Sequence, residues 1–147
     1  MKQTVEQDID LIVAEFDKAM VSAEKSAFGS VSYYVEDLKH TSLYLRIYTG
    51  RQCRWTRPVI VISTINVYKT GKGTFHALLA KLKVLAAERQ WIIKVENVLM
   101  PEFRSYLQRQ DFVMHGERHC GIGNMFWFYD KALLQEEELP PRNPNGI

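Results

Sequence analysis

Residues 59–85 constrain the fold more than any other part of the chain. They contain the apolar run Val59-Ile60-Val61-Ile62, then Thr70-Gly71-Lys72-Gly73-Thr74, and then the periodic segment Phe75-His76-Ala77-Leu78-Leu79-Ala80-Lys81-Leu82. This order predicts a strand over residues 59–67 that is buried on both faces, a glycine loop, and an amphipathic helix. A helix start has backbone N–H groups without intrahelical partners and carries the positive end of the helix dipole. Glycines there allow a phosphate to approach the backbone, so this loop is the candidate binding site.

The remaining segments predict an α+β fold with a mixed sheet. Apolar residues at three- and four-residue steps indicate a helix over residues 4–23, with Thr4 as its cap. Further strands are expected over residues 31–36, 43–48, 91–95, 112–114 and 125–129, and a short helix over residues 101–110. The strand, helix, strand order around the glycine loop predicts a right-handed crossover between parallel neighbours. We therefore expect a twisted mixed sheet of about six strands. It would be flanked by the N-terminal helix, the helix after the glycine loop and the short helix before the last two strands.

Composition favours one domain with a core of its own. The chain has 147 residues, of which 46% are hydrophobic. We expect residues 1–134 to form the domain and residues 135–147, which are acidic and rich in proline, to form a flexible tail. The net charge of +2 is too small to indicate a nucleic-acid partner by itself. A local basic patch with interleaved aromatic residues could either contact nucleic acid or be a solvated strand end and loop. The patch comprises Arg46, Arg51, Arg54 and Arg57 with Tyr44, Tyr48 and Trp55.

Cysteine usage and hydropathy predict a cytoplasmic protein that does not enter a membrane. Cys53 and Cys120 make no disulfide framework, and the polar amino terminus does not resemble a secretory leader. No apolar run approaches the roughly 20 residues needed to span a bilayer. Cys53 and Cys120 could be combined with His115 and His119 as a zinc set, but their spacing matches no zinc motif, so we expect no metal.

The order of elements resembles the GNAT superfamily of N-acetyltransferases over residues 31–129, most closely over residues 59–113. In that family a Gln/Arg-x-x-Gly-x-Gly/Ala loop after the fourth strand holds the pyrophosphate of coenzyme A, and two leucines commonly follow. Aligning on Leu78-Leu79 places Thr70, Gly73 and Phe75 at the three loop positions. A second register, on Tyr68, Gly71 and Gly73, keeps both glycines but shifts the leucine pair by two residues.

The resemblance implies a set of residues that contact acetyl-CoA or another acyl-CoA. Residues 95–112 are similar to the family's fifth strand with an Asn at its end, followed by a helix and a closing Phe, although Asp111 replaces the usual Gly before Phe112. The cofactor contacts that follow from this match are Val67, Tyr68, Thr70, Gly71, Lys72, Gly73, Thr74, Phe75, Asn97 and Arg104.

The resemblance also implies direct attack of a substrate amine on the thioester, which needs a base for the amine and an acid for the thiolate. Glu96 is the candidate general base, and Glu36 is an alternative. Glu96 could instead be an ordinary solvated carboxylate at the end of a strand. The family's acid tyrosine falls at Leu107, so the neighbouring Tyr106 is the candidate acid; the other reading packs it beside Phe103 with its hydroxyl at the rim.

Three functional hypotheses follow. The first is an acyl-CoA-dependent N-acyltransferase acting on an unidentified amine. The second is a binding protein that keeps this fold without its chemistry, because Thr70, Phe75 and Leu107 depart from the family pattern. The third is an acyltransferase-like enzyme that modifies nucleic acid through the basic patch. A compact phage-type member of the family would suit the short amino-terminal region, and a dimer is a plausible assembly.

Overall fold

The secondary structure was assigned in a computed structural model, which describes residues 2–49, 57–67, 73–96, 98, 100–114 and 123–135, with backbone only for 64–67 and 134–135. The helices are α1 (Val5–Lys25), α2 (Thr74–Arg89), α3 (Pro101–Arg109) and the 3-10 helix η1 (Lys131–Gln135). The strands are β1 (Ser30–Tyr34), β2 (Thr41–Tyr48), β3 (Val59–Val67), β4 (Ile92–Val95), β5 (Val113–Met114) and β6 (Met125–Trp127). Each expected helix and strand is therefore present, with ends that differ by a few residues.

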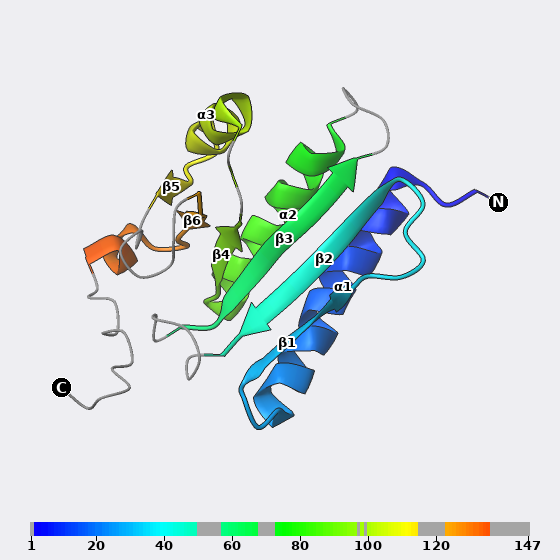
Figure 1. The fold of residues 1–147 in the computed structure, drawn as a ribbon, viewed down its shortest axis with the longest axis horizontal. Coiled ribbons are helices and arrows are strands. Elements are labelled where there is room, and N and C mark those ends of the chain that lie inside the picture. The colour runs from blue at the N-terminus through cyan, green and yellow to red at the C-terminus, as the bar shows by residue number, and fades with distance from the viewer. Residues whose placement is uncertain are drawn as a thin grey trace.

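The strands form one six-stranded mixed sheet in the order β1-β2-β3-β4-β6-β5 (Figure 1). β1, β2 and β3 form an antiparallel meander, and β3 pairs with β4 in parallel, as the strand, helix, strand order predicts. β6 is antiparallel to both of its neighbours, β4 and β5. The fold is thus α+β, with the parallel pair at the centre of the sheet.

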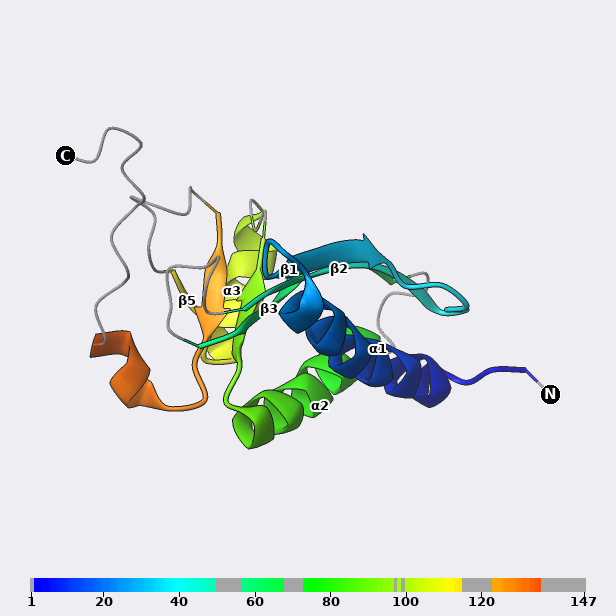
Figure 2. The same cartoon turned by 90° about the horizontal axis from the view of Figure 1, so that it is seen from below.

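Helices α1 and α2 cover one face of the sheet (Figure 2). The cap predicted at Thr4 is present and forms a capping box: the Gln7 amide donates to Thr4 Oγ1 at 3.1 Å, and the Thr4 amide donates to Gln7 Oε1 at 2.8 Å. The apolar faces of both helices pack on the inward side chains of β2, β3 and β4, and Phe16, Leu45, Ile62 and Leu82 are fully buried there. This packing places the start of α2 next to the end of β3.

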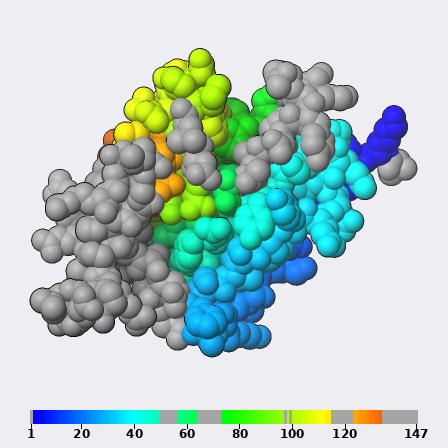
Figure 3. All heavy atoms as spheres, in the orientation of Figure 1, coloured from blue at the N-terminus to red at the C-terminus, as the bar shows by residue number. Residues whose placement is uncertain are grey.

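The opposite face of the sheet is covered only in part by the described residues. A second apolar cluster lies over β3, β4 and β6 and contains Val59, Val61, Ile92, Phe126, Phe128 and Leu133. Its last member comes from η1, which packs over this end of the sheet. The outward side chains of β1 and β2 are mostly polar and lie at the surface. Figure 3 shows the molecule from this side.

Two sequence expectations concern the whole chain. Within the described residues, no helix is long and apolar enough to cross a membrane. The expected domain boundary near residue 134 falls inside η1, and the flexible tail expected from residue 135 lies, from residue 136 on, outside the described residues.

Candidate functional site

The candidate site lies where β3 and β4 part. Their parallel pairing runs from Val59 opposite Ile92 to Ile62 opposite Val95, and the Glu96 amide adds a last hydrogen bond to the Ile62 carbonyl at 3.1 Å. Beyond that point β4 ends, whereas β3 continues to Val67 with β2 as its described neighbour. From residue 63 onward, one edge of β3 therefore has no strand partner within the described residues.

A bulge marks the same position on β3. Leu45 of β2 pairs with Ile62 and Tyr44 pairs with Thr64, so Ser63 is an extra residue in the β3 ladder. A bulge bends its strand and leaves the extra residue out of the regular pairing. The bend thus coincides with the loss of the β4 partner, and backbone groups of β3 face the opening between the two strands.

Helix α2 begins near this opening without a side-chain cap. Gly73 is the N-cap residue, with φ +67° and exposed, and apart from its chain neighbours no described residue lies within 4 Å of the position that a Cβ would take. The first intrahelical bond runs from the Ala77 amide to the Gly73 carbonyl, so the amides of residues 74–76 have no intrahelical acceptor. The first turn carries no acidic residue, and the dipole therefore leaves a positive end suited to an anion.

An aromatic cluster joins the start of α2 to α3. Ring centroids of Phe75 and Phe103 are 5.4 Å apart, and those of Phe103 and Tyr106 are 6.4 Å apart and nearly parallel. The Tyr106 hydroxyl lies 3.2 Å from Nδ1 of His76, a hydrogen bond between the two helices. Burial raises the pKa of Tyr106, against the opposing charge of Arg109. Tyr106 therefore packs beside Phe103 with its hydroxyl at the rim, next to the first turn of α2.

Arg104 and Thr74 serve local structure. An Nη of Arg104 donates to the Val98 carbonyl at 3.2 Å, which ties α3 to the segment that follows β4. Its Nε is buried and has no partner among the described atoms. Thr74 is buried at the start of α2. Phe75, Tyr106 and His76 thus come together, whereas Arg104 points back to the chain that follows β4.

Glu96 lies on the other face of the sheet, in a cluster of charges. Its Oε1 is 3.4 Å from an Nη of Arg46 on β2, and its Oε2 is 3.3 Å from Nζ of Lys94 on β4. The side chains of Glu96 and Lys94 are 15% and 13% exposed, and that of Arg46 is 33% exposed. The same Nη of Arg46 also donates to the Tyr48 hydroxyl at 3.2 Å. Burial alone would lower the pKa of Arg46, but its contacts with Tyr48 and Glu96 raise it overall.

Several predicted residues cannot be placed. Tyr68, Thr70, Gly71, Lys72 and Asn97 lie outside the described residues, and Val67 is described by its backbone alone. Also outside the described residues are the four residues whose spacing matches no zinc motif, His115, His119, Cys53 and Cys120, and three residues of the basic patch, Arg51, Arg54 and Trp55. Where side chains are described, no group of three or more His, Cys, Asp or Glu is arranged to hold a metal.

Sequence reasoning missed two contacts. One is the hydrogen bond between His76 and Tyr106, which joins positions 30 residues apart that share no local signal. The other links Lys94 and Arg46 through Glu96. A signal for this second contact exists, because Arg46, Lys94 and Glu96 all occupy outward positions of strands that alternate with buried residues.

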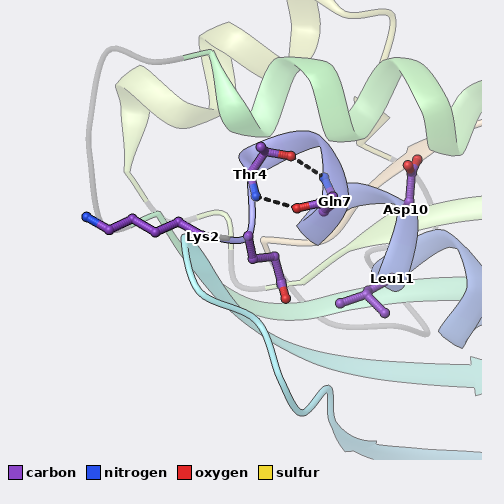
Figure 4. A pocket seen from close by; sticks show the side chains of 6 residues that line it. Lys2, Thr4, Gln7, Asp10 and Leu11 are labelled. Atoms are coloured by element: carbon purple, nitrogen blue, oxygen red, sulfur yellow. Dashed lines mark hydrogen bonds between the residues drawn. The ribbon is translucent and has the colours of Figure 1, made fainter.

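Two surface hollows with fully described linings lie away from these groups. One, of about 590 Å³, is lined by the start of α1, from Lys2 to Leu11, and contains the capping box (Figure 4). The other, of about 510 Å³, lies between α1 and α2, with Val13, Val84 and Leu85 in its wall. Neither includes Gly73, Tyr106 or Glu96, and the first is formed by a single segment of chain.

Comparisons with known proteins do not assign the chain to a family. No protein-family model matches it, and no curated protein shows significant similarity to it.

Proposed function

We propose that this chain is an N-acyltransferase with a GNAT-like fold that uses acetyl-CoA or another acyl-CoA. One observation carries the proposal: three features meet at one end of the molecule (Figure 1). These are the opening between β3 and β4 beyond Ile62, the uncapped start of α2 at Gly73, and Tyr106 beside that start. In this reading β3 corresponds to the family's fourth strand, β4 to its fifth, and α2 to the helix that binds pyrophosphate.

The start of α2 fits the pyrophosphate of coenzyme A. It has free backbone donors, the positive end of a helix dipole, no acidic side chain in its first turn, and open space around Gly73. Phe75 at the family's Gly/Ala position does not block the donors, because its ring packs toward Phe103 and Tyr106. The resemblance adds Thr70, Gly71, Lys72 and Asn97 as further contacts.

The proposed reaction is direct transfer of the acyl group. The amine nitrogen forms a bond to the thioester carbon, the carbon–sulfur bond breaks, and the sulfur leaves with its electron pair. Backbone N–H groups of β3 at the opening would stabilise the charge that develops on the carbonyl oxygen. The amine proton would pass to Glu96 or to water, and the hydroxyl of Tyr106 would protonate the thiolate. A phenol with an ordinary pKa of about 10 is protonated at neutral pH, as this role requires, and burial raises the pKa of Tyr106 further.

Acetyl-CoA binding tests the cofactor site. Asp and Asn have nearly the same size and both tolerate a positive φ, so Gly73→Asp and Gly73→Asn differ mainly in charge. Calorimetric titration should show binding to the unmodified protein, and Gly73→Asp should bind about tenfold more weakly than Gly73→Asn. Equal affinities of the two variants would place the pyrophosphate elsewhere. No binding by the unmodified protein at millimolar acetyl-CoA would refute the proposed function.

Thiol release tests the chemistry. With a panel of amines, release of free coenzyme A should be detectable, and Tyr106→Phe should lower kcat about 100-fold while leaving the Kd for acetyl-CoA unchanged. Binding without turnover for any amine would instead support the binding-protein hypothesis. The nucleic-acid hypothesis gains no support from Arg57, whose Nε donates to the Tyr129 hydroxyl at 2.9 Å within the domain.

A further inference from the structure

The charged cluster around Glu96 forms part of a row of cross-strand neighbours on the face of the sheet opposite α1 and α2. Arg46 on β2, Val61 on β3 and Lys94 on β4 are cross-strand neighbours, and Phe126 on β6 follows Lys94. The two cations therefore stand on either side of a buried valine. Glu96, the first residue after β4, is the next outward residue beyond Lys94 and reaches both of them. The row crosses β3 at Val61, two residues before the bulge at Ser63.

Among the described side chains, this cluster has one more positive charge than negative charge. Two cations share a single carboxylate, and Lys94 and Glu96 are mostly buried. A partly buried charge without a full counter-charge is unfavourable, so the cluster is suited to a second anion. Among the described residues, one Nη of Arg46 donates to both the Tyr48 hydroxyl and Glu96 Oε1. The other Nη and the Nε of Arg46 could therefore donate to an oxyanion in a bidentate contact.

Aromatic side chains border the cluster on the side of the opening. Tyr44 is the next outward residue of β2 toward the end of β3. Its ring contacts the ring of Tyr34 edge-on, with the ring centroids 4.7 Å apart. The Tyr44 hydroxyl donates to Ser32 Oγ at 3.0 Å, which fixes the orientation of the ring. Tyr34 is exposed, and β1 and β2 lie at the surface in Figure 3. An apolar or aromatic body could rest against these rings while its charged end reaches Arg46.

We propose that this face binds the acyl acceptor, and that the acceptor carries an oxyanion, a carboxylate or a phosphate, close to its amine. Arg46 and Lys94 hold the oxyanion, Glu96 faces the amine, and the Tyr34–Tyr44 pair contacts the body of the molecule. The role as acceptor rests on the proposed function, whereas recognition of the oxyanion is a binding property that can be measured without acyl-CoA.

Matched pairs of ligands test the oxyanion directly. Titrations without acyl-CoA would compare L-phenylalanine with phenethylamine for a carboxylate, and O-phosphoethanolamine with ethanolamine for a phosphate. In at least one pair the charged member should bind about tenfold or more tightly, and the pair that shows the difference identifies the source of the oxyanion. Equal affinities within both pairs, or no binding of any of the four ligands at millimolar concentration, would overturn the proposal.

Variants locate the contact. Arg46→Met and Lys94→Met should each remove most of the preference for the charged ligand, and Arg46→Lys should restore part of it. Lys25→Met, at an exposed position at the end of α1, is the matched loss of one charge and should leave the preference unchanged. Circular dichroism melting confirms that each variant is folded. A preference that persists in both Arg46→Met and Lys94→Met would show that the oxyanion binds elsewhere.

This outcome is separable from that of the proposed function. Gly73→Asp lies at the start of α2 and should leave oxyanion binding unchanged, although it weakens acetyl-CoA binding. Oxyanion binding in a protein that does not bind acetyl-CoA would therefore refute the acyltransferase alone. Acetyl-CoA binding without any oxyanion preference would refute this inference alone.

Discussion

Replacing Asp8 with Asn should destabilise the fold more than any comparable change of a surface carboxylate. Asp8 lies in the first turns of α1 and is fully buried. Its oxygens accept the backbone amide of Lys39 at 3.0 and 3.1 Å and that of His40 at 2.7 Å, and they also accept the side-chain amide of Gln3. This carboxylate therefore joins α1 to the connection between β1 and β2.

The magnitude follows from the count of acceptors. An Asn side chain has one accepting oxygen and one NH₂ group, so one of the donors around residue 8 must face another donor. Leaving such a buried donor unsatisfied costs about 1–3 kcal/mol, and the remaining bonds lose their charge assistance. We therefore expect Asp8→Asn to lower the free energy of unfolding by about 2.5 kcal/mol, which corresponds to about 5–10 °C in Tm for a domain of this size.

Asp10→Asn is the matched control. Asp10 is on the same helix and loses the same charge, but it is exposed and contacts only Lys81, at 3.0 Å, in the ion pairs of the described residues. A surface pair of this kind contributes about 0–1 kcal/mol. Urea unfolding followed by circular dichroism, with equal m-values, compares the two variants. If Asp8→Asn were no more destabilising than Asp10→Asn, the argument that Asp8 anchors the β1–β2 connection would be wrong.

Three further predictions concern the same fold. Leu82→Ala should cost about 3 kcal/mol in unfolding free energy because Leu82 is fully buried in the core, whereas Val84→Ala on the exposed face of α2 should cost less than about 1 kcal/mol. Thr4→Ala should cost about 1 kcal/mol by removing the capping box, and Thr4→Ser should retain most of that stability. The pKa of Tyr33 is raised by burial, by the 2.7 Å hydrogen bond that its hydroxyl donates to Glu15, and by the negative charge of Glu15. The folded state therefore holds the phenol proton of Tyr33 more tightly than the unfolded chain does. Stability should therefore fall as pH rises above about 10, and the fall should be shallower in Tyr33→Phe, as measured by urea unfolding at pH 9 to about 11.

Local patterns predicted the elements well because each pattern reports a face that must be buried. The period of three to four residues in α1 and the alternation in β2 both match the observed burial. The ends were less predictable: β6 stops at Trp127, before Tyr129, because pairing with β4 sets its length. The contacts of Lys83 were not predictable from local pattern: its Nζ lies 5.9 and 5.8 Å from the ring centroids of Phe112 and Trp127 and donates to the Gln110 carbonyl at 2.7 Å.

The sequence predicted individual residues of the candidate site but not the contacts between them. Gly73 was identified at the start of α2, because a glycine before an apolar periodic segment marks a helix start, and its positive φ agrees. Tyr106 was named as a residue, but its bond to His76 depends on how α3 packs on α2. Glu96 was named as a lone carboxylate, whereas the structure gives it two cationic neighbours from different strands.

The helices, the strands, the parallel pair and the glycine at the start of α2 are predictable from the amino-acid sequence, since they follow from periodicity and backbone preferences within short segments. The point where β3 and β4 part, the bulge at Ser63 and the sharing of Glu96 by Arg46 and Lys94 arise only in the folded molecule. Such features depend on the register between strands, and register is set by many weak contacts between residues far apart in the chain. The residues that would carry the chemistry are therefore visible in the sequence one at a time, and only the fold brings them together.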